Sequence, residues 1–358
     1  MEKIKIAQII GNSSCGGVIS CLMNYYRHID REAVRFDFFT YGPSSYDEEI
    51  KALGGEVHYF PTVFNFGPAV TELTKQLKGY DAVHVHMTTL SFVGLMAAKN
   101  AGVPVRICHS HSTTDTKDGL KLVVKDVLRY PTRFFATHEM GCSERSNRWL
   151  FGKGNDATLL HNAIDLERFT PCKNRAALRK KYGLEGSFVY GFIGRFETQK
   201  NVPFLIKAFA VVAQKKPDSK LVLVGDGTQK QKVLSLIKEN GLDDKVLILP
   251  DCSQVEKYYA LFDLFVLPSI FEGLPLVAVE AQAMKLPCLL SDHITAEAAV
   301  GGVCKFASID RPDRWAQAML QAASLHGVEC HRAMTENGYD IRTEAPKLLE
   351  WYKEIIKK

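Results

Sequence analysis

Short apolar segments rich in valine, isoleucine and phenylalanine alternate with longer amphipathic segments along the whole chain, and this alternation constrains the fold most. The pattern is typical of parallel strands joined by crossover helices, so it predicts an α/β protein. In the first half, we expect strands at 4–10, 36–40, 57–60, 82–86, 105–109, 134–136, 140–142 and 158–160. The pattern then restarts, with strands expected at 189–193, 221–224, 246–249, 264–267, 288–290 and 303–306.

The chain has 358 residues, which is too many for one ordinary core. The restart follows a linker that contains Pro171, so we place the domain boundary near Phe169. We expect two Rossmann-like domains, at 1–168 and 169–342, with parallel sheets that face each other across a central cleft. An amphipathic helix at 343–358 is expected to pack back on the first domain. Ligands of open parallel sheets bind at the carboxyl ends of the strands.

The charge balance excludes few partners but argues against one class. Lys and Arg number 45 against 40 Asp and Glu, a net charge of +5, which is low for a nucleic-acid-binding protein. The first residues alternate charge with isoleucine, unlike a signal peptide, and no apolar run reaches the roughly 18 residues of a spanning helix. We therefore expect a cytoplasmic protein without a nucleic-acid partner, whose membrane association, if any, is peripheral.

The first candidate site in the second domain follows the strand at 189–193. Gly194 and Arg195 come directly after this strand, and Lys200 lies five residues after Arg195. The Arg195 fork can chelate a phosphate, and Lys200 supplies a compact second charge, so the pair could neutralise a diphosphate without a metal. The alternative is two solvated loop cations.

The second candidate follows the strand at 264–267. Gly273 and Pro275 mark a sharp loop and a helix start, and the loop amides near Leu274 to Val277, Leu276 among them, would direct their donors at an anion. A phosphate bound there needs no further cation.

Two glutamates flank this loop. Glu280 lies about one turn inside the expected helix, where its carboxylate could accept hydrogen bonds from two ribose hydroxyls, and Glu272 in the loop could reach a sugar. Each alone reads as an ordinary surface glutamate, and the combination with Arg195 and Lys200 favours the functional interpretation.

The first domain carries a glycine-rich turn between its first strand and first helix. Gly16 and Gly17 would let a phosphate or sugar approach the backbone closely. The GxGxxG spacing of dinucleotide-binding turns is absent, so NAD binding has weak support, and a plain strand-to-helix turn is the alternative.

His109 and His111 follow the strand at 105–109 and would share one side of it. A metal site lacks an evident third ligand, so a contact to a sugar hydroxyl or a phosphate fits better. His84 and His86 are expected to pack at the end of the preceding strand.

Cations recur every four residues at 117–133, beside an apolar face. On a helix this spacing would form a stripe that could bind anionic lipid head groups, with a solvated helix face as the alternative.

With these residues assembled, the chain resembles the retaining glycosyltransferases of family 4, which have the GT-B fold, and most of all the bacterial branch that builds capsular polysaccharides and exopolysaccharides. The segment 267–283 carries the family's two glutamates, Glu272 and Glu280, separated by seven residues. Gly194-Arg195 with Lys200-Asn201 and the His109-Ser110-His111 run add to the resemblance.

The resemblance implies a role for each candidate. Arg195 and Lys200 would hold the donor diphosphate, Glu280 the ribose and Glu272 the sugar hydroxyls. His111, or alternatively His109, would lie near the reaction centre.

The donor would be a nucleotide-sugar, most simply a UDP-sugar, and the acceptor a lipid-linked glycan. The family implies one-face transfer with retained anomeric configuration, with no cofactor and no metal. Donor sugar, base, acceptor and linkage stay open. A nucleotide-sugar epimerase or phosphorylase of the same fold is the alternative enzyme class, and a non-catalytic transferase partner is a third.

Overall fold

The computed structural model describes residues 3–11, 16–111, 120–172, 174–250 and 254–357, with side chains described in all of these except 120–126. It divides the chain into two compact units. Unit 1 comprises Met1–Ile164 and Asp340–Lys358, and unit 2 comprises Asp165–Tyr339.

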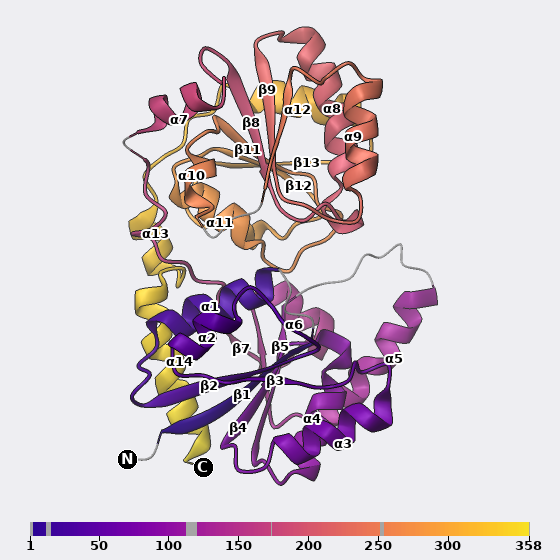
Figure 1. Cartoon of the computed structure of the whole chain (residues 1–358), viewed down its shortest axis with the longest axis vertical. Coiled ribbons are helices and arrows are strands. Elements are labelled where there is room, and N and C mark those ends of the chain that lie inside the picture. Colours follow the sequence, from indigo (N-terminus) through magenta and orange to yellow (C-terminus); the bar gives the residue numbers. More distant parts are fainter. Residues whose placement is uncertain (1–2, 12–15, 112–119, 173, 251–253, 358) are drawn as a thin grey trace. The chain divides into compact units, whose positions relative to one another are not determined.

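Unit 1 is built on a seven-stranded parallel sheet with the order β3-β2-β1-β4-β5-β6-β7 (Figure 1). Ile6 in the central β1 pairs with Phe36 of β2 on one side and with Ala82 of β4 on the other. The strands are β1 (Ile4–Gly11), β2 (Val34–Thr40), β3 (Val57–Tyr59), β4 (Ala82–Val85), β5 (Val105–Ser110), β6 (His138–Gly141) and β7 (Thr158–Leu159).

Helices cover both faces of this sheet, because each parallel strand pair needs a right-handed crossover. In Figure 1, α1, α2 and α14 lie on the side opposite α3, α4 and α5. The helices of unit 1 are α1 (Gly17–His28), α2 (Asp47–Ala52), α3 (Phe66–Gln76), α4 (Ser91–Asn100), α5 (Leu120–Phe135), α6 (Glu144–Phe151) and α14 (Ile341–Ile356), with a 3-10 turn η1 (Thr88–Leu90).

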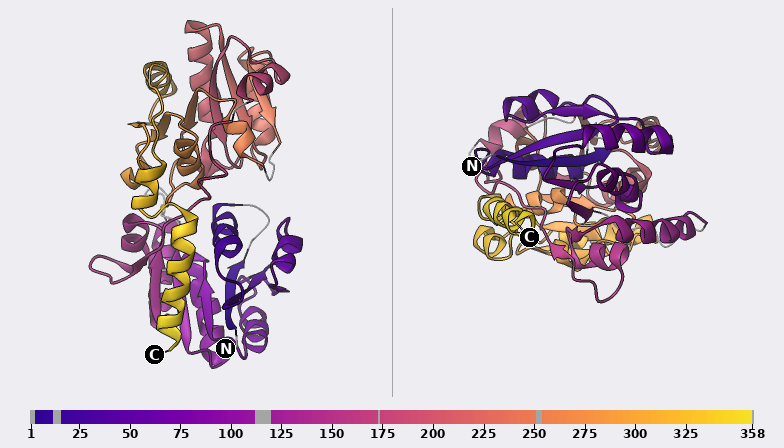
Figure 2. Two further views of the ribbon diagram at one scale, coloured as in Figure 1. Left: turned by 90° about the vertical axis from the view of Figure 1, so that its left-hand side faces the viewer. Right: turned by 90° about the horizontal axis from the view of Figure 1, so that it is seen from below.

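The last helix returns the chain to unit 1. The Asp340 carboxylate caps α14 by accepting the N–H of Arg342, and Ile341 N–H donates to the carbonyl of Ile164 at 3.0 Å. Helix α14 then runs beside α1 along the sheet (Figure 2). Residues Asp340–Lys358 thus belong to the same compact unit as Met1–Ile164.

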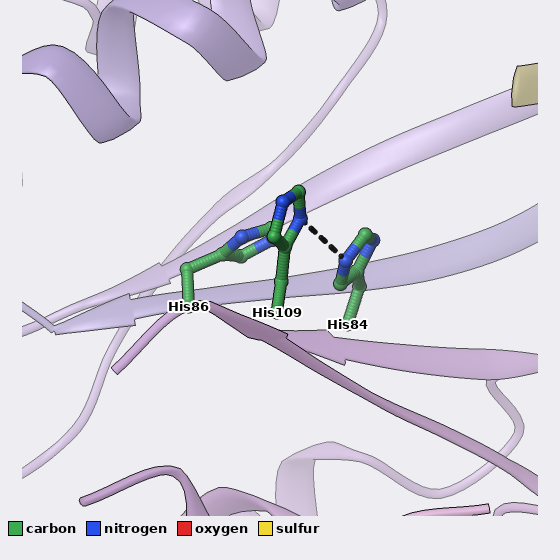
Figure 3. Close-up of side chains that lie close together, drawn as sticks. All are labelled: His84, His86 and His109. Atoms are coloured by element: carbon green, nitrogen blue, oxygen red, sulfur yellow. Dashed lines mark hydrogen bonds between the residues drawn. The ribbon is translucent and has the colours of Figure 1, made fainter. Parts of the chain in front are cut away.

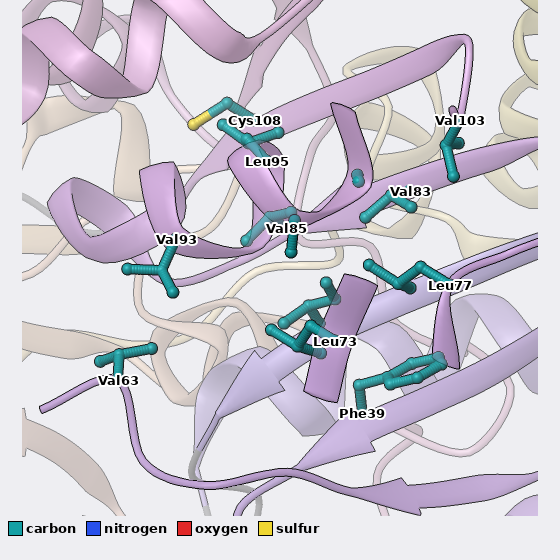
Figure 4. Close-up of a cluster of buried hydrophobic side chains, with 14 of the residues drawn as sticks. Phe39, Val63, Leu73, Leu77, Val83, Val85, Val93, Leu95, Val103 and Cys108 are labelled. Carbon is teal, nitrogen blue, oxygen red and sulfur yellow. The ribbon is translucent and has the colours of Figure 1, made fainter. Parts of the chain in front are cut away.

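Strand alternation sends neighbouring side chains of β4 to opposite faces of the sheet in unit 1. Val83 and Val85 of β4 point into a buried cluster with Leu73 of α3 and Val93 of α4 (Figure 4). His84 lies between these valines in the sequence, so it points to the opposite face, toward α14.

Unit 2 has a six-stranded parallel sheet with the order β10-β9-β8-β11-β12-β13. Its strands are β8 (Phe188–Ile193), β9 (Ser219–Val224), β10 (Val246–Leu249), β11 (Leu264–Leu267), β12 (Cys288–Ser291) and β13 (Cys304–Ala307). Its helices are α7 (Arg175–Lys181), α8 (Val202–Lys215), α9 (Lys230–Glu239), α10 (Glu256–Tyr259), α11 (Leu276–Ala283), α12 (Pro312–Ala322) and α13 (His331–Glu336), with 3-10 turns η2 (Thr198–Lys200) and η3 (Ala296–Ala298).

The predicted α/β class with two parallel sheets is confirmed, and one predicted strand is wrong. Residues 134–136 were expected to form a strand, but α5 continues to Phe135, and Ala136 N–H still donates to the carbonyl of Thr132. Aromatic residues favour strands, yet the helical periodicity of this segment prevails. Phe134 stays exposed, with the ammonium of Lys99 over its ring.

Within the described ranges, no helix is both long enough and apolar enough to cross a membrane.

Candidate functional site

The candidate site of unit 2 lies at the carboxyl edge of its sheet. Strands β8 and β11 are parallel neighbours, so the loops that follow Ile193 and Leu267 leave the sheet on the same edge. These loops carry the residues singled out in the sequence. Ile270 N–H donates to the carbonyl of Gln199 at 2.8 Å and ties the two loops together.

Lys200 and Glu272 form an ion pair between these loops. Lys200 Nζ lies 2.6 Å from Glu272 Oε1, and the side chains are only 15% and 9% exposed. Gln199 supports the pair, because its Nε2 donates to the Phe271 carbonyl at 3.0 Å and to Glu272 Oε2 at 3.3 Å. Two predicted site residues, 72 positions apart in the sequence, are thus brought together.

Glu280 is held by a residue that the sequence analysis missed. Glu280 lies in α11, and its Oε2 accepts a hydrogen bond from the Tyr259 hydroxyl at 2.7 Å. The same hydroxyl lies 3.0 Å from the carbonyl of Val277. Burial, together with the charge of Glu280, raises the pKa of Tyr259 well above its usual value of 10, so the hydroxyl stays protonated and donates. No sequence signal marks Tyr259, because its partner lies in another helix.

The loop at the start of α11 forms as predicted. Gly273 and Leu274 are buried, Pro275 is the N-cap residue, and the helix begins at Leu276. The first amides of a helix have no partner in the preceding turn, and the helix dipole makes this end electropositive. These four residues therefore present a helix N-terminus next to Glu272.

Gly194 and Arg195 follow β8 directly. Gly194 has a φ of 154°, and a Cβ at Gly225 would lie 2.2 Å from the Gly194 carbonyl oxygen. The two strand ends approach so closely that residue 225 must be glycine. Of the two cations predicted to bind phosphate, Lys200 pairs with Glu272. The Arg195 side chain is exposed to solvent at this turn.

A hollow of about 320 Å³ opens at the carboxyl ends of β9 and β10. Its lining residues are Gly225, Asp226, Lys230, Leu234, Ile248, Leu249 and Pro250. The sequence analysis left the nucleotide base open. Residues 251–253, which follow Pro250 in the sequence, lie outside the described residues.

The glycine-rich turn of unit 1 is described only in part. Residues 12–15 lie outside the described ranges. Gly16 has a φ of 150° and precedes α1, which starts at Gly17. Among the described residues, no atom lies within 4 Å of a Cβ built at either glycine.

Four histidines come together at the ends of β4 and β5. The rings of His84, His86 and His109 lie side by side (Figure 3), and the His111 ring stacks on His109 with 3.8 Å between centroids. His84 Nε2 lies 3.1 Å from His109 Nδ1, and His86 Nδ1 lies 2.7 Å from His111 Nε2. Sequence spacing predicted no third ligand beside His109 and His111, and the neighbouring strand β4 brings His84 and His86 to them.

This cluster is uncharged. His84, His86 and His109 are at most 4% exposed, and burial lowers their pKa values well below 6.5. Burial also lowers the pKa of His111 to about 3. One nitrogen each from His84, His86 and His109 lies within 4.8 Å of the others, a spacing that a metal ion could use after small ring movements.

Helix α5 is partly described. Lys117 and the side chains of Lys121 and Lys125 lie outside the described part. The remaining cations are engaged: Arg133 pairs with Glu139 at 3.0 Å, and Arg129 Nη1 donates to the Trp149 carbonyl at 3.2 Å. Three apolar residues of α5 are strongly exposed, namely Val127, Tyr130 and Phe134.

Comparisons with known proteins agree with this architecture. Residues 16–159 match the model of the glycosyl transferase 4-like domain, and residues 174–340 match that of glycosyl transferases group 1. The chain is 34% identical to EpsF of Bacillus subtilis over 373 aligned residues, which cover 97% of this chain and 96% of EpsF. The chain is a family 4, group 1 glycosyltransferase.

Two further proteins resemble this glycosyltransferase. It is 33% identical, over 60% of its own length and 58% of the relative, to the UDP-Gal:alpha-D-GlcNAc-diphosphoundecaprenol alpha-1,3-galactosyltransferase of Escherichia coli. The crystal structure of HepE from Anabaena in complex with UDP-glucose matches with a TM-score of 0.82 and 19% identity over 99% of both chains. The GT-B fold expected from the sequence is confirmed, and the enzyme belongs to a retaining family.

Proposed function

We propose that this glycosyltransferase moves a sugar from a UDP-sugar to a lipid-linked glycan during capsular or exopolysaccharide synthesis. The observation that carries the proposal is the Lys200–Glu272 pair beside the N-terminus of α11. A cation, a carboxylate and a helix N-terminus at one sheet edge suit a ligand that combines phosphates with sugar hydroxyls.

Unit 2 would bind the donor. Lys200 and Arg195 neutralise the diphosphate together with the N-terminus of α11, and Glu280 accepts hydrogen bonds from the ribose. Glu272 accepts from hydroxyls of the transferred sugar. Because Lys200 and Glu272 pair without ligand, donor binding replaces one ion pair with two new contacts and leaves neither charge unpaired.

The reaction is a single substitution at the anomeric carbon. The bond from that carbon to the β-phosphate oxygen breaks as the bond to the acceptor oxygen forms on the same face. The acceptor hydroxyl gives its proton to the departing phosphate oxygen, so no metal and no further reactant is needed for the balance. Lys200 and the α11 amides stabilise the growing charge on the leaving diphosphate.

Unit 1 would bind the acceptor, with Gly16 and Gly17 at the open start of α1 close to the reacting groups. His111 is the proposed contact to the sugar, with His109 stacked behind it. The name of the Escherichia coli relative supports a diphosphoundecaprenol-linked acceptor, and the UDP-glucose bound to HepE supports a UDP-sugar donor.

A lipid-linked acceptor calls for membrane contact, and α5 is the proposed surface. Tyr130 and Phe134 are 66% and 74% exposed, beside Arg129 and Arg133. Aromatic rings insert at the head-group level of a bilayer, so the exposed pair carries this proposal, while Arg129 and Arg133 are held by the Trp149 carbonyl and Glu139. The aromatic pair supports the interpretation of α5 as a peripheral membrane helix.

Calorimetry with UDP, GDP and ADP tests the donor site. We expect UDP to bind most tightly and the Glu280→Ala variant to lose about tenfold or more in affinity, since its carboxylate forms charge-assisted hydrogen bonds. The matched control is Glu239→Ala, an exposed glutamate at the end of α9 in the same unit. Equal UDP affinity in both variants would remove the ribose role of Glu280, and a preference for GDP or ADP would overturn the UDP assignment.

A further inference from the structure

Six buried or half-buried side chains of unit 1 form one continuous chain of hydrogen bonds. In order along the chain of bonds, they are His111, His86, Gln8, Tyr352, His84 and His109. They come from β1, the ends of β4 and β5, and the C-terminal helix α14. Every link between them is side chain to side chain, so their protons are set jointly.

Gln8 fixes the direction of this chain. Its carbonyl oxygen Oε1 can only accept, so His86 Nε2, at 2.8 Å, must carry a proton and donate it. Its amide nitrogen Nε2 can only donate, and it donates to the Tyr352 hydroxyl at 3.4 Å. The hydroxyl therefore keeps its own proton for another acceptor.

That acceptor is His84. Tyr352 donates to His84 Nδ1 at 2.7 Å, so the neutral His84 ring carries its proton on Nε2. This proton is donated to His109 Nδ1 at 3.1 Å, which places the proton of His109 on Nε2. His109 Nε2 is buried and has no hydrogen-bond partner among the residues described.

The protons at the His111 end of this chain of hydrogen bonds follow from Gln8 in the same way. His86 carries its proton on Nε2, so its Nδ1 has the lone pair and accepts from His111 Nε2 at 2.7 Å. The lone pair of the neutral His111 is then on Nδ1. His109 thus offers a donor and His111 an acceptor, which together match a hydroxyl group, since a hydroxyl both donates and accepts.

We propose that Tyr352 is a positioning residue that sets the tautomers of His84 and His109, as Gln8 sets those of His86 and His111, so that His109 Nε2–H and His111 Nδ1 bind a hydroxyl group of a sugar substrate. The inference rests on the proposed function, which brings a sugar to this edge of unit 1. It assigns to the C-terminal helix a part in the site, although Tyr352 lies 241 positions after His111 in the sequence.

The same bonds argue against a metal ion among these histidines. A neutral imidazole has one lone pair, and a metal ligand must direct it at the ion. The lone pair of His84 accepts from Tyr352, that of His109 from His84, and that of His86 from His111. All three candidate ligands therefore use their lone pairs already.

Nitrogen-15 NMR of the full-length protein with labelled histidine tests the assignment. At pH 7, we expect His84, His86, His109 and His111 to be neutral with the proton on Nε2. In Tyr352→Phe, the His84–His109 bond can run in either direction, so both rings should populate the Nδ1–H tautomer. The matched control is Tyr26→Phe, a buried tyrosine of the same unit whose hydroxyl donates to the Leu53 carbonyl.

Three results would overturn the proposal. One is a proton on Nδ1 of His84 or His109 in the unmodified protein, a result that needs no variant to fold. Another is an unchanged tautomer pattern in Tyr352→Phe. The third is stoichiometric Zn²⁺ binding by the metal-free protein that disappears in His84→Ala.

Kinetics adds a second readout. With a UDP-sugar donor, kcat of Tyr352→Phe should fall about tenfold while its KM for the donor changes little, and Tyr26→Phe should behave like the unmodified enzyme. Equal kcat in the two variants would contradict a positioning role. Because the tautomer pattern is measured without turnover, it decides this inference even if no UDP-sugar proves to be a substrate.

Discussion

Each unit holds one fully buried tyrosine whose hydroxyl donates at 2.7 Å to a candidate site residue, but the two recipients differ in charge. Tyr259 of unit 2 donates to the carboxylate of Glu280, which lies near the Lys200–Glu272 ion pair along the same loop and helix. Tyr352 of unit 1 donates to the neutral ring of His84.

The difference follows from what each edge would bind. Fixed charges stabilise a group whose own charge grows during the reaction, as on a departing diphosphate. Neutral imidazoles can be buried without a counter-ion and still order hydroxyl groups. We therefore expect charge to matter at the edge of unit 2 and the direction of hydrogen bonds to matter at the edge of unit 1.

The largest expected effect concerns the charged edge of the sheet in unit 2, which carries Lys200 and Glu272. Lys200→Ala should lower kcat by about 10²–10³-fold, because the leaving diphosphate loses a preorganised cation. Turnover is measured by UDP release in the presence of acceptor. The exposed Lys207→Ala in α8 of the same unit is the control and should keep full activity. A fall in kcat of less than fivefold in Lys200→Ala would contradict a catalytic role for this charge.

The histidine cluster of unit 1 should make the folding stability fall in acid. Burial holds the pKa values of His84, His86 and His109 below 6.5 in the folded state, whereas the unfolded chain takes up protons near 6.5. Stability is therefore full above pH 6.5 and is lost as the pH falls below it. Between pH 6.5 and 5.5 each histidine should remove about 1 kcal/mol, roughly 3 kcal/mol together.

Urea unfolding at pH 7.5, 6.5 and 5.5 measures this loss. His111→Gln should flatten the pH dependence, because it removes one further imidazole whose pKa burial lowers to about 3. The exposed His326→Gln in unit 2 is the control. A pH dependence equal in both variants would mean that the cluster accepts protons while folded.

A smaller effect is expected from the tyrosine of unit 2. Tyr259→Phe removes one hydrogen bond to the Glu280 carboxylate and should weaken UDP binding about tenfold in calorimetry. Tyr190→Phe, a buried tyrosine of β8 whose ring packs on Phe188 and Phe209, is the control. Unchanged UDP affinity in Tyr259→Phe would mean that the hydrogen bond from Tyr259 to Glu280 does not contribute to UDP binding.

The smallest effect concerns the surface of α5. Replacing Tyr130 and Phe134 together by serine should reduce binding to phosphatidylglycerol vesicles several-fold in sedimentation, since both rings are exposed. Val328→Ser, an exposed apolar residue of unit 2, should leave binding unchanged. Equal vesicle binding by both variants would return α5 to an ordinary solvated helix.

Much of the fold could be predicted because burial of parallel strands on both faces leaves continuous apolar runs in the sequence. The strands at 246–249 and 264–267 were predicted to the residue. The error at 134–136 arose where two aromatic residues end a helix, since local propensity cannot reveal that Phe134 faces solvent.

The candidate site residues likewise divide into those that could be predicted from the sequence and those that could not. Glu272 and Glu280 could be found because they share one loop and one helix, within a segment that resembles a family motif. Tyr259, Tyr352 and Gln8 could not, because their partners are set by strand order and helix packing over separations of 21 to 344 residues. The meeting of His84 with His109 likewise depends on β4 and β5 being neighbours in the sheet.

The most direct test of the central claim is the anomeric configuration of the product. The purified enzyme would be given UDP-α-glucose, UDP-α-galactose and their N-acetyl forms with undecaprenyl-diphosphate-linked monosaccharides, and the new linkage would be read by proton NMR. Retaining transfer predicts an α-linked product, and a β-linked product would contradict the account.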